Sequence, residues 1–372
     1  MRTLVAALLM TLVLLAGDAS LRAQTASRFA SMSGEQAYDA ACAACHGTDG
    51  RGNPKSVVGF DVPLPDFTDC TFSTPEPDGD WGSVIHLGGP ARAFSRVMPA
   101  FGEALSDEDI DKLVGYLRGF CTDPSWPLGD LNLPRPLVTE KAFPENETVI
   151  SMAIAHGDEA SVATDVVYER RLGKRSQFEL AVPVELQKGA GGTWQRGLGD
   201  VVFAVKHALF HSRPAGSILS VGVEAVFPTG KETERFGKGV NLFEPFVAFG
   251  QMLPSDGFLH LHSGVELPAD TDKSSKEAFW RMAIGKSFME NGGLGRAWTP
   301  MVELVGAKEL VDEEDAQWDI VPQMQITLSK RQHIMINAGL RIPLTSRAER
   351  HVQVLTYFLW DWFDGGLFDG WR

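Results

Sequence analysis

The sequence Cys-Ala-Ala-Cys-His at residues 42–46 constrains this chain more than any other feature. Cysteines three residues apart lie on one face of a helix, because an α-helix completes a turn about every 3.6 residues. Two thiols so placed match the two vinyl groups of a haem, and the histidine that follows can bind the iron. The motif therefore predicts one covalently bound haem c, attached through Cys42 and Cys45 with His46 as proximal ligand. A zinc pair is the alternative, but zinc needs further ligands nearby, and residues 47–69 contain no cysteine or histidine.

The first 23 residues have the pattern of a secretory signal peptide. Arg2 precedes an apolar run from Leu4 to Leu15, and small and polar residues follow it, with cleavage expected after Ala19 or Ala23. The run is too short to span a bilayer as a helix. Because no cysteine lies near the cleavage site, a lipoprotein anchor is not expected. We therefore expect export to the periplasm or beyond, a compartment that permits disulfides.

The two cysteines outside the motif, Cys70 and Cys121, are expected to form a disulfide in that compartment. Closing a loop of about 50 residues would contribute roughly 3 to 4 kcal/mol in the chain-entropy model. Two separate buried thiols are the alternative.

Two capping boxes mark helices in the first part of the chain. Ser33 to Gln36 is typical of a helix start, and that helix leads into the motif at 42–46. Ser106 to Asp109 starts a second helix, whose apolar face is made by Ile110, Leu113, Val114 and Leu117. We expect the second helix to pack against the first.

The order of motif helix, irregular loop, Met-Pro and terminal helix resembles class I cytochrome c across residues 32–121. This resemblance implies that Met98 is the sixth ligand of the haem iron, and His86 is its rival in the same loop. Pro99 stiffens the loop beside Met98, which favours the methionine. A Met/His pair leaves no open coordination position, so the resemblance implies electron transfer rather than oxygen or peroxide chemistry.

Beyond Cys121 the composition changes. Five prolines fall within residues 122–146, which predicts a semi-rigid linker on the surface between two domains. The region 147–363 contains no cysteine and alternates with period two, and 364–372 is left as a C-terminal tail. In Phe178–Leu186, for example, every second residue is apolar and glutamates lie on the other face.

The same alternation occurs in about twelve segments of roughly 10 to 13 residues, an even number and a length typical of outer-membrane barrel strands. Short turns, such as 172–175, 213–216, 254–257 and 329–331, alternate with mostly longer loops, such as 229–239 and 269–276. The short turns are expected to face the periplasm. Tryptophans at or near strand ends suggest interfacial girdles; they are Trp280, Trp298, Trp318, Trp360 and Trp362.

The predicted fold class is therefore α plus all-β: a small all-α cytochrome c domain followed by an antiparallel β-barrel of about 12 strands. A soluble β-sandwich with its apolar faces inside is the competing structure. Residues 197–206 and the stretch from Val223 to Lys231 resemble the phenol meta-pathway outer-membrane family, which favours the barrel. The chain ends in Trp371-Arg372, which departs from the aromatic residue that usually ends such barrels. Phe363 is instead expected to end the last strand.

A cytochrome joined to such a barrel is also similar to the fused cytochrome-porin iron oxidases, which pass electrons from extracellular donors to periplasmic carriers. About twelve strands enclose only a narrow lumen, so a folded cytochrome would not fit inside. An even strand number places the cytochrome on the periplasmic side. A single haem there does not carry electrons across an apolar band about 25 Å tall. We therefore expect a periplasmic donor, or a small reductant that diffuses through the pore.

The remaining charged residues suggest few additional sites. His260, His262 and Glu266 share one strand face and are candidate metal ligands, although a polar barrel lumen also explains them. The net charge of −14 argues against nucleic acid and favours basic redox partners or cations.

Three functions remain open. We favour an electron-transfer protein, rather than an enzyme with its own substrate site, that is anchored in outer-membrane lipid and relays electrons between a donor and periplasmic redox carriers. A soluble periplasmic subunit of a redox enzyme, with a β-sandwich that docks a partner, is the second. A pore whose cytochrome acts as sensor or plug is the third.

Overall fold

The computed structural model describes residues 29–92, 94–157, 160–189, 192–289, 296–329, 332–347 and 350–361. The chain forms two compact units, which divide between Pro124 and Ser125. The predicted signal peptide, the predicted C-terminal tail, Trp362 and Phe363 lie outside the described residues.

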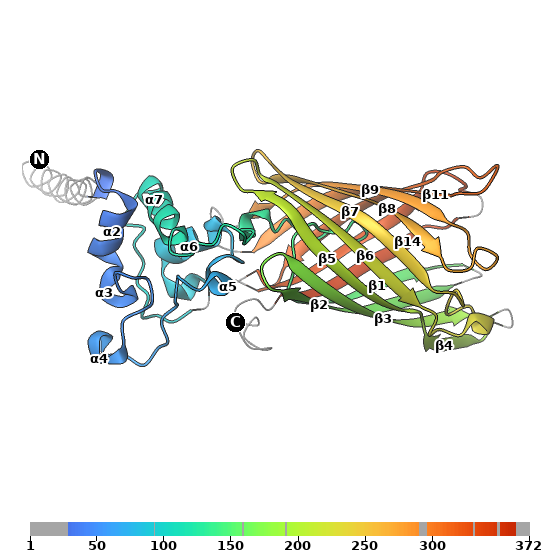
Figure 1. Ribbon diagram of the computed structural model, residues 1–372, viewed down its shortest axis with the longest axis horizontal. Coiled ribbons are helices and arrows are strands. Elements are labelled where there is room, and N and C mark those ends of the chain that lie inside the picture. Colours follow the sequence, from blue (N-terminus) through green and yellow to red (C-terminus); the bar gives the residue numbers. More distant parts are fainter. Residues whose placement is uncertain are drawn as a thin grey trace, which may run out of the picture. The chain divides into compact units, whose positions relative to one another are not determined.

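The first unit is helical (Figure 1). Its elements are α2 (Gly34–Ala41), α3 (Ala43–His46), α4 (Lys55–Val58), α5 (Cys70–Ser73), α6 (Asp78–Leu87), the 3-10 turn η1 (Gly89–Arg92) and α7 (Asp107–Arg118). In the described part of the chain, no helix combines the length and the apolar content needed to cross a bilayer.

Both predicted capping boxes are present. The Ser33 hydroxyl accepts a hydrogen bond from the Gln36 backbone N–H, and the Gln36 side chain accepts one from the Ser33 N–H. The same reciprocal pair joins Ser106 and Asp109 at the start of α7. These bonds satisfy backbone donors that the first turn of a helix leaves unpaired, and so they fix where α2 and α7 begin.

Helices α2 and α7 pack against each other, as predicted. Gly34 lies so close to the Lys112 carbonyl that a side chain at position 34 would collide with the α7 backbone. All four residues of the predicted apolar face of α7 are buried, together with Ala37 and Tyr38 of α2, in one core. The helix that leads into the Cys-Ala-Ala-Cys-His motif is thereby held in place by α7.

The capping box of α7 gives a pH-dependent prediction. The hydrogen bond from the Ser106 hydroxyl holds the pKa of the buried Asp109 carboxyl below its usual range. Because the folded pKa lies below the unfolded pKa of about 3.9, this carboxylate stabilises the fold above that pH. The stabilisation is lost as the pH falls through the folded pKa.

We therefore expect Asp109→Asn to destabilise the helical unit by about 1 kcal/mol at pH 7, a typical contribution of a helix cap, and by progressively less as the pH falls below about 4. Urea unfolding of the full chain, followed by helical circular dichroism between pH 3 and 7, measures this difference. Asp111→Asn, at an exposed position of the same helix, is the control. A gap between wild type and Asp109→Asn that is constant with pH would contradict the assignment.

The second unit is an antiparallel sheet (Figure 1). Its strands are β1 (Glu147–Ala155), β2 (Ser161–Leu172), β3 (Ser176–Lys188), β4 (Trp194–Leu198), β5 (Val201–Ser212), β6 (Ser217–Phe227), β7 (Leu242–Leu253), β8 (Gly257–Pro268), β9 (Glu277–Lys286), β10 (Phe288–Met289), β11 (Ala297–Glu309), β12 (Gln317–Thr327), β13 (Ile334–Pro343) and β14 (Gln353–Asp361).

The sheet closes into a barrel of twelve strands. Strands β4 and β5 both pair with β3, and β9 and β10 both pair with β11, so each of these pairs forms a single position in the ring. The ring is completed because β1 pairs with β14 on one side and with β2 on the other. The predicted antiparallel barrel of about twelve strands is confirmed.

The faces of the barrel are apolar outside and polar inside. Apolar residues on alternate positions are exposed, as at Leu180 and Val184 of β3, where 40% and 42% of the surface is accessible. Their neighbours toward the lumen are buried and polar, as at Gln177 of β3 and at His260 and His262 of β8, each 2% exposed. The soluble sandwich with apolar faces inside is therefore wrong, because a closed barrel turns these faces outward.

The connections follow the predicted alternation. Short turns join β2 to β3, β5 to β6 and β7 to β8, whereas 14 and eight residues separate β6 from β7 and β8 from β9. The turn predicted at 329–331 lies partly outside the described residues. Trp298 and Trp360 lie near the short-turn end, and Trp318, whose ring contacts that of Trp280, lies near the end with the longer loops.

The prediction that residues 122–146 form a linker on the surface is wrong in one respect. Leu131, Thr139, Ala142 and Phe143 are each at most 2% exposed. The predicted surface location fails because the polar lumen of the barrel accepts this proline-interrupted chain and supplies its hydrogen bonds.

Candidate functional site

The Cys-Ala-Ala-Cys-His motif forms a helical turn at the end of α2. The chain bends at Cys42, which begins α3, and His46 donates its backbone N–H to the Cys42 carbonyl over 2.9 Å. Cys42 and Cys45 are both free and half-buried. Two free thiols on one turn, next to a histidine, fit the donor set that a haem c requires.

The loop after the motif is tied back onto it. The Asn53 side-chain amide donates to the carbonyls of Ala43 and Ala44, each over 3.0 Å, and the Asn53 N–H donates to the Cys45 carbonyl. The Tyr38 hydroxyl donates to the Gly47 carbonyl over 2.6 Å. These bonds tie the following loop to the motif turn.

The protonation states of the motif also fit a haem. Burial lowers the pKa of His46, which favours the neutral imidazole, the form in which histidine ligates iron. Burial, followed by the neighbouring Cys45, raises the pKa of the Cys42 thiol to about 11. His46 Nδ1 is buried and has no hydrogen-bond partner in the described part of the chain.

The two candidates for the sixth ligand lie on either side of one tight turn. His86 is in the last turn of α6, and Met98 follows the 3-10 turn η1. The Gly89 N–H donates to the Met98 carbonyl over 3.1 Å, and the Gly102 N–H donates to the His86 carbonyl over 2.9 Å. Both side chains are half-buried, so ligation by Met98 rather than His86 stays a prediction.

The remaining two cysteines form a disulfide. Cys70 at the start of α5 is bonded to Cys121, three residues beyond the end of α7, and their Cα atoms are 5.2 Å apart. The bond joins the loop region of the unit to its terminal helix. It leaves Cys42 and Cys45 as the only unpaired cysteines, so no other thiol in the sequence competes with them.

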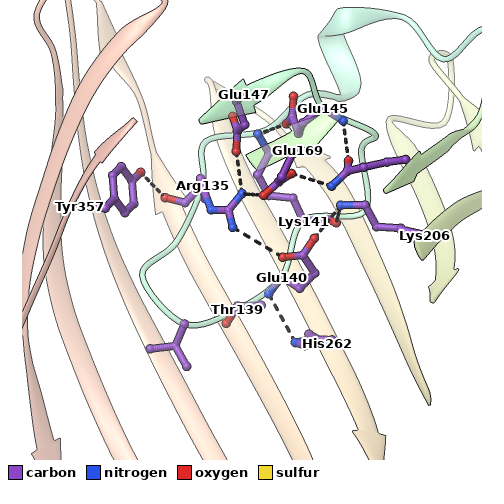
Figure 2. A network of polar contacts seen from close by, with 12 residues as sticks. Arg135, Thr139, Glu140, Lys141, Glu145, Glu147, Glu169, Lys206, His262 and Tyr357 are labelled. Atoms are coloured by element: carbon purple, nitrogen blue, oxygen red, sulfur yellow. Dashed lines mark hydrogen bonds and ion pairs between the residues drawn. The ribbon is translucent and has the colours of Figure 1, made fainter. Parts of the chain in front are cut away.

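The second notable site lies inside the barrel. Residues 129–146, which we call the lumen segment, begin with the 3-10 turn η2 (Gly129–Leu131) and end where β1 starts. Figure 2 shows the polar side chains of this segment directed at those of the surrounding strands.

One buried carboxylate binds the tip of the lumen segment. Glu303 of β11 is fully buried and accepts hydrogen bonds from the backbone N–H groups of Leu137, Val138 and Thr139 over 2.7 to 3.3 Å. It also accepts bonds from the Thr139 hydroxyl and the Gln323 amide. Successive backbone N–H groups that converge on an anion form a strong anion site, and here the anion belongs to the barrel wall.

Charged pairs fix the rest of the segment. Arg135 lies between Glu147 and Glu169, with N–O distances of 2.6 and 2.5 Å. Lys206 of β5 pairs with Glu140 over 2.6 Å and donates to the Lys141 carbonyl over 2.7 Å. Figure 2 shows these groups as one connected network. Buried charges are tolerated only where they are paired in this way, so the lumen is matched to this segment.

Bonds from opposite sides of the wall complete the binding. The Tyr357 hydroxyl of β14 donates to the Arg135 carbonyl, and the Ser220 hydroxyl of β6 donates to the Ala142 carbonyl. A cavity of about 10 Å³ remains beside the segment, lined by Glu140, Glu179 and Lys206 among others. That volume holds about one water molecule.

The candidate metal ligands in the barrel do not converge. The His260 ring nitrogen Nε2 lies 3.0 Å from the Pro134 carbonyl, and the His262 Nδ1 lies 3.4 Å from the Glu140 backbone nitrogen. Glu266 pairs with Lys238 over 2.6 Å. Within the described residues, no group of three or more His, Cys, Asp or Glu side chains is arranged to hold a metal ion. The histidines instead contact the lumen segment.

Reasoning from the sequence missed the lumen segment, Glu303 and Asn53. A signal for the first was present: Leu131, Leu133, Leu137 and Phe143 are too apolar for a solvated linker. The role of Glu303 had no such signal, because its partners are backbone N–H groups more than 160 positions away.

Comparison with known proteins supports the two-part reading. Residues 30–117 match the family model described as cytochrome C oxidase, cbb3-type, subunit III. The first unit is a cytochrome c domain. The match covers less than half of the chain, so it classifies the cytochrome unit alone. No curated protein matches the chain.

The solved structures that are similar to this chain include an outer membrane channel and two porins. The COG4313 outer membrane channel from Pseudomonas putida F1 is 11% identical, with a TM-score of 0.44 over 62% of this chain and 100% of that chain. The NanC porin is 10% identical, with a TM-score of 0.39 over 58% and 98%. The KdgM porin is 10% identical, with a TM-score of 0.38 over 58% and 99%. At these values the activities of those proteins are not transferred to this chain.

The identity of the sixth ligand can be tested by substitution. We expect Met98→Ala to abolish the absorption band that arises from charge transfer between methionine sulfur and ferric iron, because the thioether is removed. His86→Ala should leave that band unchanged. Absorption spectra of the oxidised full-length protein provide the measurement. An unchanged spectrum in Met98→Ala would favour His86 as the ligand instead.

The binding of the lumen segment can be tested at Glu303. We expect Glu303→Ala to leave at least three buried donors without an acceptor, at about 1 to 3 kcal/mol for each. The segment should then become accessible to protease, and the ionic conductance of the protein in a planar bilayer should rise. Glu224→Gln is the control. Glu224 lines the small cavity beside the lumen segment, but it makes no hydrogen bond to that segment within the described residues. Equal protease resistance of both variants would contradict the role of Glu303.

Proposed function

We propose that this chain is a haem-c electron-transfer protein that is anchored in the outer membrane by its barrel and relays single electrons between a donor and periplasmic carriers. The observation that carries the proposal is the free Cys42–Cys45 pair beside the half-buried His46, within a cytochrome c domain. A haem bound there supplies one-electron oxidation and reduction of its iron.

Electron transfer is favoured over an enzymatic reaction by the axial ligands. With His46 on one side and Met98 on the other, no coordination position remains for a substrate, oxygen or peroxide. The chain's own residues then have three tasks: to hold the iron, to limit its exposure to water and to present it to a partner. The net charge of −14 supports a basic partner, which opposite charge would steer toward the protein.

The outer surface of the barrel supports membrane anchoring. Ile284, Phe243 and Leu209 are 48 to 51% exposed on its outer face, and such a belt of apolar side chains is stable only in lipid. Closure of the sheet pairs the backbone groups of every strand, as a membrane-spanning sheet requires. Tryptophans near both ends agree with two interfacial girdles.

The occupied lumen favours an anchor over a pore. Glu303, Lys206 and Arg135 belong to a network that binds the lumen segment on several sides, so the segment takes up space that a pore would need. A small reductant that diffuses through the barrel, as an extracellular donor would require, is therefore disfavoured. We propose a donor on the same side of the membrane as the cytochrome unit.

That side is proposed to be the periplasm. The Ser125 carbonyl accepts a hydrogen bond from Arg175, and Asp130 pairs with Arg213 over 3.2 Å; both arginines lie in short turns of the barrel. The chain therefore enters the barrel at its short-turn end, and in outer-membrane barrels that end faces the periplasm. Attachment of haem c after export agrees with this placement.

The proposal is tested by following haem through cell fractionation. We expect the full-length protein to carry one haem per chain by the pyridine haemochrome assay. It should be recovered with the outer membrane, and be released by detergent but not by salt. Recovery of the haem protein in the soluble periplasm would refute the anchor. Absence of covalent haem would refute electron transfer.

The outward face gives a matched prediction. We expect Val223→Arg, at the middle of β6 and 39% exposed, to destabilise the barrel in lipid by about 2 to 4 kcal/mol and to lower its recovery in the outer membrane. Asp272→Arg introduces the same charge in the loop between β8 and β9, outside the apolar band, and should have little effect. Urea unfolding in detergent micelles, with immunoblots of membrane fractions, measures both. Equal behaviour of the two variants would argue against a lipid-facing position 223.

A further inference from the structure

We propose that Phe67 is a positioning residue that sets the orientation of the His46 imidazole, and thereby the electronic state of the iron that His46 would hold. This inference rests on the proposed function, because it concerns the predicted proximal ligand. It goes beyond that function by naming what controls the ligand.

The two rings are stacked. The centroid of the Phe67 ring lies 4.9 Å from that of the His46 ring, and the ring planes are inclined by 26°. Phe67 is 6% exposed and belongs to the same core as α2 and α7. Rotation of the imidazole about its side-chain bonds would therefore drive it into a buried aromatic ring.

Phe67 itself is fixed from several directions. Its backbone N–H donates to the Gly50 carbonyl over 2.8 Å, within the loop that follows the motif. The centroid of the Phe67 ring lies 5.4 Å from that of Trp81 in α6 and 6.3 Å from that of Phe120. Its neighbours Asp66 and Thr68 form a local turn, in which the Thr68 N–H and hydroxyl donate to the Asp66 carboxylate. These contacts fix the position of the Phe67 ring against the imidazole of His46.

The contacts of His46 fix its backbone and its ring separately. The His46 carbonyl accepts a bond from the Gly52 N–H, which fixes the backbone but not the ring. Metal-ligating histidines usually have a hydrogen-bond acceptor for the second ring nitrogen, which fixes the plane of the ring. His46 Nδ1 is buried without such a partner in the described part of the chain. The stacking contact with Phe67 constrains the plane of this ring.

The orientation of the imidazole plane has an electronic consequence. An axial imidazole interacts with the iron d orbitals through its π system, so rotating its plane redistributes the unpaired electron of ferric iron and changes the relative stability of the two oxidation states. We therefore expect the ring at position 67 to affect the spectrum and the midpoint potential.

The test uses the full-length protein purified in detergent, with haem content measured first. We expect Phe67→Leu to retain covalent haem, to change the anisotropy of the ferric electron paramagnetic resonance spectrum and to shift the midpoint potential. Phe67→Tyr, which keeps a ring, should restore both properties toward wild type. Phe72→Leu is the control, because Phe72 packs against the same core and contacts Trp81 rather than His46.

The outcomes separate the inference from the proposed function. If Phe67→Leu matches wild type in spectrum and potential, or if Phe72→Leu changes both as strongly, Phe67 has only a packing role and the inference is wrong. If Phe67→Leu does not fold, Phe67→Met decides, because it also removes the ring and its flexible side chain can fill the core. A potential displaced from that of wild type without loss of haem supports the inference, and an unchanged potential overturns it. Absence of covalent haem from wild type would refute the proposed function instead.

Discussion

Closure of the sheet is the constraint on which the second unit depends. Once β1 pairs with β14, every strand has two neighbours, and alternation of side chains commits one whole face to the outside and the other to the lumen. The outer face is apolar and requires lipid. The inner face carries buried charges, such as Glu303, Glu169 and Lys206, which are stable only when they are paired. The lumen segment provides that pairing.

This view explains why the segment between the two units is not a passive linker. Its prolines prevent strand pairing, so its backbone groups are available to side chains of the wall. Glu303 takes three consecutive N–H groups, and Tyr357 and Ser220 take carbonyls from opposite sides. The segment and the wall satisfy each other's polar groups, so the barrel binds the lumen segment of its own chain.

The cytochrome unit depends on different physics. It is small, and capped helices, one core and a disulfide between Cys70 and Cys121 hold it together. Within it, Asn53 and Tyr38 secure the motif loop by hydrogen bonds, and Phe67 lies against the imidazole of His46. The unit can therefore present the motif in a fixed geometry. The proposed role of the barrel is to anchor the chain in the membrane.

The capping boxes, the motif at 42–46 and the period-two strands were legible in the sequence because each depends on residues close together in the chain. Local hydrogen bonds and alternation determine helix starts, strand faces and strand number. Three features were decided only by tertiary structure: the burial of the lumen segment, the hydrogen bonds that Glu303 accepts from it, and the stacking of Phe67 on His46. Each joins residues that are distant in sequence, and closure of a barrel or a core brings them together without leaving a local pattern.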